Sequence, residues 1–114
     1  MNTNMLNEEF VSLLAADPLQ AKVLPVAWVQ ALINWFTQFE KYPRSSMPLN
    51  IVQGYEDRTV SFRHNLRVLS GRFENAAIWI IPKARHHLVN ETPDIYAEIW
   101  SWLDDSCDWY TAKC

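Results

Sequence analysis

Two short apolar runs, separated by a segment with helical periodicity, constrain the fold of this chain more than any other feature. The runs are Leu49–Gln53, which Gly54 ends, and Ala77–Ile81, which Pro82 ends. Both have the length and composition of short strands. The segment between them places four apolar residues on one face of a helix beginning near Thr59: Phe62, Leu66, Leu69 and Phe73. This order predicts two parallel strands joined by a right-handed crossover helix. The second run is apolar at every position, which is typical of a sheet covered on both faces.

Three further helices are predicted around this unit. The first covers Glu8–Ala16 and ends near Asp17, because the residue before a proline disfavours the helical conformation. The second covers residues 25–41, with a proline in its first turn. The third follows Thr92, which we expect to cap it, and has Pro93 in its first turn.

The helix predicted over residues 25–41 is apolar around nearly its whole circumference. Its apolar residues are Val26, Ala27, Trp28, Val29, Ala31, Leu32, Ile33, Trp35, Phe36 and Phe39. A helix without a polar face is buried or has a partner. We therefore expect this helix to need cover, and we expect core packing for Trp28, Trp79 and Trp102.

Composition places the chain among globular proteins. Of its 114 residues, 49% are hydrophobic and 20% are charged, which indicates one domain or part of one. The net charge is −3 and no basic run is present, which argues against nucleic acid as a partner.

The sequence also bears on location. The N-terminus has no signal-peptide pattern, and no apolar run is long enough to cross a bilayer, so we expect no transmembrane segment. Cys107 and Cys114 are too few for a secreted disulfide scaffold and are expected to be reduced. Together these features predict a cytoplasmic or membrane-peripheral location.

Polar residues follow both predicted strands. Asp57 comes just after the first strand and His86 just after the second. Open α/β sheets place their chemistry beyond the carboxyl ends of their strands. On spacing alone, Asp57 is also compatible with an ordinary turn residue after the glycine. Glu56 is a competing carboxylate and His87 a competing imidazole, whereas His64 is expected on the surface of the crossover helix.

Metal and cofactor sites are not indicated. Adjacent histidines rarely share the coordination sphere of one ion, and the sequence contains neither H-x-x-x-H nor C-x-x-C. We therefore expect no metal and no cofactor.

Two phrases carry a family resemblance. The phrase P-L-x-I-V-Q-G-x-x-D-R-T-V, followed by I-P-x-A-R-H-H-L-V-N-E, resembles the C-terminal part of α/β-hydrolases. Within that fold it is similar to the lysophospholipase and monoacylglycerol lipase group of serine hydrolases. Upstream, Asp17-Pro18-Leu19 and residues 25–32 resemble the end of the group's lid and the helix that returns to the core. The resemblance spans roughly residues 10–105.

This resemblance implies a fold and a domain organisation. The fold class is α/β: a C-terminal fragment of the α/β-hydrolase fold, with two parallel strands, a crossover helix and flanking helices. Residues 1–20 correspond to the end of a lid-like region, residues 21–106 to the C-terminal part of the core, and residues 107–114 to a tail.

The resemblance also implies a catalytic pair. Asp57 takes the place of the triad acid and His86 that of the triad histidine. In such a triad, the histidine removes the proton of a serine nucleophile, and the carboxylate fixes its tautomer. Glu56 and His87 are then neighbours without a catalytic role, and Asn90 and Glu91 form a turn before the last helix.

The nucleophile of the family has no counterpart in these 114 residues. The only glycines, Gly54 and Gly71, are too far apart to form a G-x-S-x-G turn. The resemblance therefore predicts the C-terminal portion of a serine ester hydrolase, acting on lipid-like or small acyl esters when an N-terminal part completes it. The chain alone is expected to be inactive, and to self-associate or bind a complementing chain. The alternative is a non-catalytic protein-binding module, or a gene remnant, derived from the same fold.

Overall fold

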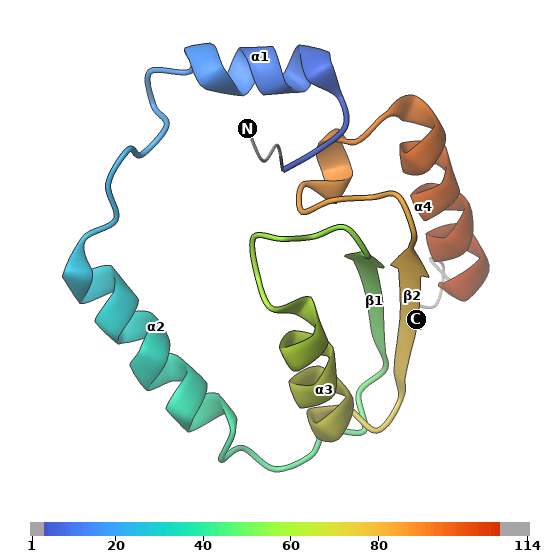
Figure 1. Ribbon diagram of the computed structural model, residues 1–114. Helices are drawn as coiled ribbons and strands as arrows, with labels where there is room; N and C mark the ends of the chain where they lie inside the picture. Colours follow the sequence, from blue (N-terminus) through green and yellow to red (C-terminus); the bar gives the residue numbers. More distant parts are fainter. Residues whose placement is uncertain (1–3, 108–114) are drawn as a thin grey trace.

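The computed structural model describes residues 4–107, which form four α-helices, two strands and one short 3-10 helix (Figure 1). In chain order these are α1 (Glu8–Ala16), α2 (Val26–Phe39), β1 (Leu49–Gly54), α3 (Phe62–Arg72), β2 (Ala76–Ile81), η1 (Leu88–Asn90) and α4 (Pro93–Ser106). The two strands pair in parallel, in a register that runs from Leu49 opposite Ala76 to Gly54 opposite Ile81. The chain thus has the mixed α/β character, with two parallel strands in one sheet, that its sequence predicts.

Element boundaries lie within three residues of the predicted ones. The helix predicted from Thr59 begins at Phe62, because the backbone N–H groups of Thr59 and Val60 donate to the Asp57 carboxylate and remain in the loop. Helix α2 ends at Phe39, two residues before the predicted end. Thr92 occupies the predicted N-cap position of α4, with Pro93 in the first turn, but the Thr92 side chain makes no capping hydrogen bond.

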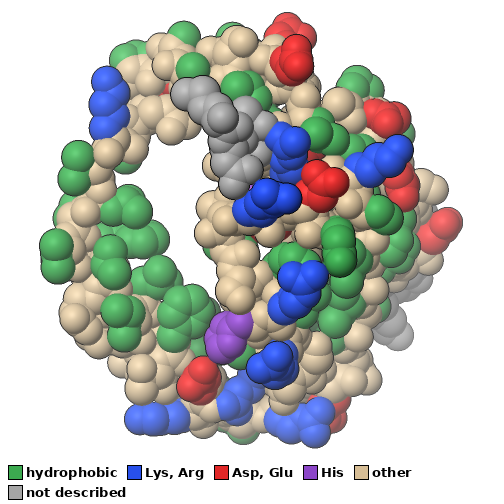
Figure 2. Space-filling view, viewed as in Figure 1, with side chains coloured by type: hydrophobic (Ala, Val, Ile, Leu, Met, Phe, Trp, Pro, Cys, Tyr) green, Lys and Arg blue, Asp and Glu red, His purple; other side chains and the backbone are tan. Residues whose placement is uncertain are grey.

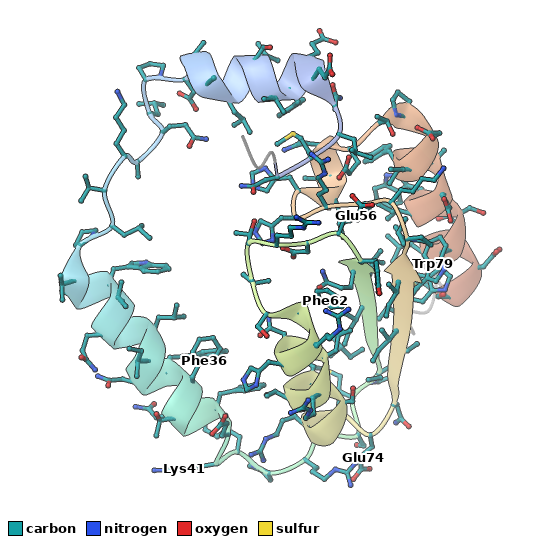
Figure 3. All side chains as sticks on the ribbon, in the orientation of Figure 1. Phe36, Lys41, Glu56, Phe62, Glu74 and Trp79 are labelled. Carbon is teal, nitrogen blue, oxygen red and sulfur yellow. The ribbon has the colours of Figure 1, made fainter. Side chains whose placement is uncertain are left out.

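The described core lies between β2 and α4. Its buried members are Ile81, Ala84, Ile95 and Ile99. Trp79 of β2, labelled in Figure 3, packs against this cluster and stacks on Trp102 of α4, with ring centroids 5.5 Å apart. The packing predicted for these two tryptophans is confirmed. On the other face of β2, Ile78 and Ile80 are each 39% exposed, so the sheet is not covered on both faces as expected.

Helix α2 lies away from this core. Figure 2 shows an opening between the segment that carries α2 and the rest of the molecule. Every residue of α2 except the half-buried Phe39 is exposed. Trp28 is 52% exposed, so the prediction that it packs in the core is wrong. Its neighbours on α2 are apolar too, and the described part of the chain places no second layer over them.

The fold is more open than that of a compact domain of the same length. The radius of gyration is 16.4 Å, against about 13 Å for a compact domain of this length. The accessible surface is 8689 Å², against roughly 6,500 Å² for a compact protein of this mass. The chain therefore exposes on the order of 2,000 Å² more than a closed domain would.

Two further observations concern location. None of the helices in residues 4–107 combines the length and the apolar character needed to cross a bilayer. Cys107 is disulfide-bonded, so the expectation that the cysteines are reduced is wrong. The rest of the predicted tail, residues 108–114, lies outside the described residues.

Candidate functional site

The loops that follow β1 and β2 are joined directly through their backbones. The N–H of Glu56 donates to the carbonyl of Ala84 at 3.0 Å. Beside this bond, a Cβ added to Gly54 would lie 2.5 Å from the carbonyl oxygen of Ala84 and closer still to that of Arg85. Only glycine leaves room for this approach. The end of β1 is therefore fixed against the loop that carries the candidate histidine.

Asp57 is fixed in the first of these loops by its own turn. Its Oδ1 accepts hydrogen bonds from the backbone N–H groups of Thr59 at 2.8 Å and Val60 at 3.3 Å. Its Oδ2 accepts a hydrogen bond from Nε2 of Gln53 at 3.2 Å. The residue is buried, with 7% of its surface exposed. These bonds leave the carboxylate one orientation, in which Oδ2 faces the second loop.

His86 meets the carboxylate from that second loop. Its Nδ1 lies 2.9 Å from Oδ2 of Asp57, so an Nδ1–H donates to the carboxylate. The two side chains differ in exposure: 33% for His86 and 3% for Asp57. In the part of the chain that the structure describes, Nε2 of His86 has no hydrogen-bond partner. The hydrogen bond at Nδ1 thus orients the imidazole, and Nε2 is available to accept a proton.

The pKa of Asp57 reflects competing effects. Burial raises the pKa of the carboxyl, whereas hydrogen bonds from His86, Thr59, Gln53 and Val60 lower it. The hydrogen bonds outweigh burial, so the pKa lies below its ordinary value of 3.8. Asp57 is therefore a carboxylate at neutral pH, as an acceptor for an imidazole N–H must be.

A second buried carboxylate supports the histidine loop. Glu91 is only 4% exposed. Its Oε1 accepts from the backbone N–H of Arg85 and its Oε2 from that of Leu6, both at 2.7 Å. Charge-assisted bonds of this kind are among the stronger ones in proteins. Glu91 therefore links the residue before His86 to the N-terminal segment, a role that its predicted place in a simple turn did not indicate.

The N-terminal segment contacts both loops of the site. The carbonyl of Asn4 accepts from the backbone N–H of His87 at 2.9 Å. The side-chain oxygen of Asn4 accepts from the hydroxyl of Thr59, also at 2.9 Å. Met5 is buried, with 2% exposed. Residues 4–6 thus form a strap over the Asp57 and His86 loops, which no local sequence pattern predicted.

The competing residues occupy other positions. Glu56 is exposed, and its Oε2 lies 3.9 Å from Nε of Arg85. His64 is exposed on α3, as expected. His87, the competing imidazole, is half-buried, and its Nδ1 is buried without a hydrogen-bond partner in the described chain. Within the described residues, therefore, Asp57 and His86 form the carboxylate–imidazole pair of this site.

Neither a metal centre nor a known relative guides the interpretation further. Within residues 4–107, no group of three or more His, Cys, Asp or Glu side chains could hold a metal ion. Comparisons of the chain with protein families, with curated proteins and with solved structures gave no match.

Adding a methyl group at Gly54 should separate the two loops. We expect Gly54→Ala to lower the free energy of unfolding by about 2–3 kcal/mol, because its Cβ meets backbone atoms that cannot rotate away. Gly71→Ala is the matched control: a Cβ at Gly71 has nothing within 4 Å, and alanine favours a helix by about 0.5–1 kcal/mol. Urea unfolding measures both. Equal changes in the free energy of unfolding for the two substitutions would contradict the close approach of Gly54 to the carbonyls of Ala84 and Arg85.

The lowered pKa of Asp57 predicts a pH-dependent contribution to stability. A carboxyl whose pKa is depressed in the folded state stabilises the fold above its unfolded pKa, about 3.9, and loses that effect as the pH falls through the folded value. We expect Asp57→Asn to be less stable than the wild type at pH 7, and this gap to narrow below about pH 4. Urea unfolding from pH 2.5 to 7 measures it. A stability difference between the wild type and Asp57→Asn that is independent of pH would show that the charge of Asp57 does not contribute to stability.

Proposed function

We propose that this chain supplies the acid and the histidine of a serine ester hydrolase, of the lysophospholipase and monoacylglycerol lipase type. In this proposal the Asp57 carboxylate orients the imidazole of His86, and His86 acts first as general base and then as general acid. The observation that carries it is the 2.9 Å contact between Oδ2 of Asp57 and Nδ1 of His86 at the ends of two adjacent parallel strands. The family resemblance of the two surrounding sequence phrases supports the same assignment.

The geometry suits the chemistry of such a pair. A general base needs one nitrogen free to take a proton and a fixed ring, so that the free nitrogen points in one direction. The carboxylate of Asp57 accepts at Nδ1 and stabilises the imidazolium as it forms. Nε2 of His86 then takes the proton of a serine hydroxyl and returns it to the leaving alcohol.

A purely structural ion pair explains the site less well. Here the carboxylate is almost entirely buried while one third of the imidazole surface is exposed. The two loops that hold the pair are joined at Gly54, and the buried Glu91 links the histidine loop to the N-terminal segment. That amount of backbone organisation favours a positioned reactive group.

In this proposal a partner provides the serine and the oxyanion hole. In α/β-hydrolases the nucleophile lies on a G-x-S-x-G turn, and its backbone supplies an oxyanion donor. The chain has no such turn. We propose that a serine-bearing polypeptide approaches the end of the sheet where Asp57 and His86 lie, and that the esters cleaved are lipid-like or carry small acyl groups.

Co-expression tests this function. The coding DNA on both sides of the gene is translated in all frames, and any product with a G-x-S-x-G turn after a predicted strand is co-expressed with the full chain. We expect the pair, and neither component alone, to hydrolyse p-nitrophenyl butyrate or a monoacylglycerol. His86→Gln should reduce kcat by about 10⁴-fold or more, because loss of the base disables the nucleophile.

The neighbouring histidine provides the matched control. His87→Gln keeps the backbone N–H that binds Asn4, and we expect this variant to retain most of the activity. Activity that survives His86→Gln, or is lost only with His87→Gln, would contradict the assignment of His86. A co-expressed pair that cleaves neither ester would contradict the split hydrolase.

A further inference from the structure

An apolar cavity of about 530 Å³ lies among β1, α2 and α3. From α2 its walls include Trp35, Phe36 and Phe39, and from α3 they include Val68 and Leu69. We call this cavity the groove. Figure 3 shows Phe36 projecting from α2 towards the opening of the molecule. The groove is thus an apolar space inside the fold that the described chain leaves unfilled.

The groove runs along the edge of β1. Four consecutive residues of the strand line it, Leu49 to Val52. Successive side chains of a strand point to opposite faces, so a cavity over one face would be lined by alternate residues. Lining by consecutive residues places the strand edge at the cavity. The sheet has the order β1-β2, so this is the side of β1 that pairs with no described strand.

The chemistry of the walls restricts the occupant. Of the residues that line the groove, only Glu40 and His64 are ionisable. An occupant that carries charged side chains into the groove would bury them against aromatic and aliphatic groups at high cost. The occupant should therefore be apolar and uncharged along the part that enters.

The exposed area is of the size that a stable partner would cover. The chain exposes on the order of 2,000 Å² more than a compact protein of its mass. Standard protein–protein interfaces bury about 800 Å² on each partner, and permanent ones bury roughly 2,000–5,000 Å² or more in total. An excess of this size on one chain therefore corresponds to a permanent interface. A partner that fills the groove and covers α2 would thus bring the surface to that of a closed domain.

We propose that the groove binds an uncharged apolar segment of a different polypeptide in extended conformation, which adds a strand to the free edge of β1. A helix would satisfy the apolar walls but leave the N–H and C=O groups of the β1 edge unpaired, whereas a strand satisfies both. The inference is independent of the catalytic roles proposed for Asp57 and His86, because neither residue lines the groove.

A second copy of this chain fits the groove less well. In each copy, residues of α2 and α3 line the same cavity as Leu49 to Val52 of β1. Edge-to-edge pairing of two copies through β1 would crowd the α2 and α3 helices of both copies against one another. A flexible or edge-exposed strand of another protein meets no such obstacle.

Site-specific photo-crosslinking in the cells that express the full chain tests this binding mode. p-Benzoylphenylalanine replaces Phe36 in the groove wall or, as a matched control, Tyr96 on α4. These positions are 42% and 41% exposed, so neither replacement disturbs a packed core. We expect the Phe36 position to crosslink to an uncharged apolar segment of another protein. In the purified complex, amide hydrogen exchange of residues 49–54 should slow by at least about tenfold relative to the free chain.

Each other outcome would overturn the proposal. A crosslink from Phe36 to a peptide of the chain itself would assign the groove to a second copy. A crosslink to a charged or helical segment would contradict the extended apolar occupant. Equal crosslinking from Phe36 and Tyr96, or a captured protein that leaves the exchange of residues 49–54 unchanged, would show that nothing adds to the β1 edge.

Discussion

The close approach of Gly54 to the carbonyls of Ala84 and Arg85 is the constraint on which the rest of the site depends. It brings the ends of two parallel strands together more closely than any side chain would permit. The carboxylate of one loop and the imidazole of the other then lie within hydrogen-bond distance, although they are 29 residues apart in sequence. Glu91 holds the histidine loop from its other side, through the N–H of Arg85.

The molecule combines an ordered polar site with an apolar surface that the described chain does not cover. The Asp57–His86 pair is held by two loops of the described chain, by the close approach of Gly54 and by hydrogen bonds from Thr59 and Val60. Helix α2 and the edge of β1, in contrast, have apolar or unpaired groups that the described chain does not cover. Both properties agree with the proposal that this chain acts beside a partner. The Asp57 and His86 side chains lie within hydrogen-bond distance, and the exposed apolar surface offers a place to bind.

Sequence patterns predicted the elements that local periodicity specifies, and they missed contacts between distant segments. Both strands, helix α1 and the positions of Asp57 and His86 followed from apolar runs, turn residues and the family resemblance. Glu91 was interpreted as a turn residue because nothing near it in sequence shows its bond to Leu6, which is 85 residues away. Trp28 was expected in a core because an apolar helix is normally covered, and periodicity does not show where the cover comes from.

The tautomer of His86 tests the central claim, that Asp57 orients this imidazole for proton transfer. Long-range ¹H–¹⁵N correlation spectra of the neutral ring distinguish a proton on Nδ1 from one on Nε2. The account predicts an Nδ1–H tautomer for His86 that loses its preference in Asp57→Ala, while the exposed His64 stays unchanged. A His86 ring protonated at Nε2, or one that does not respond to Asp57→Ala, would contradict the account.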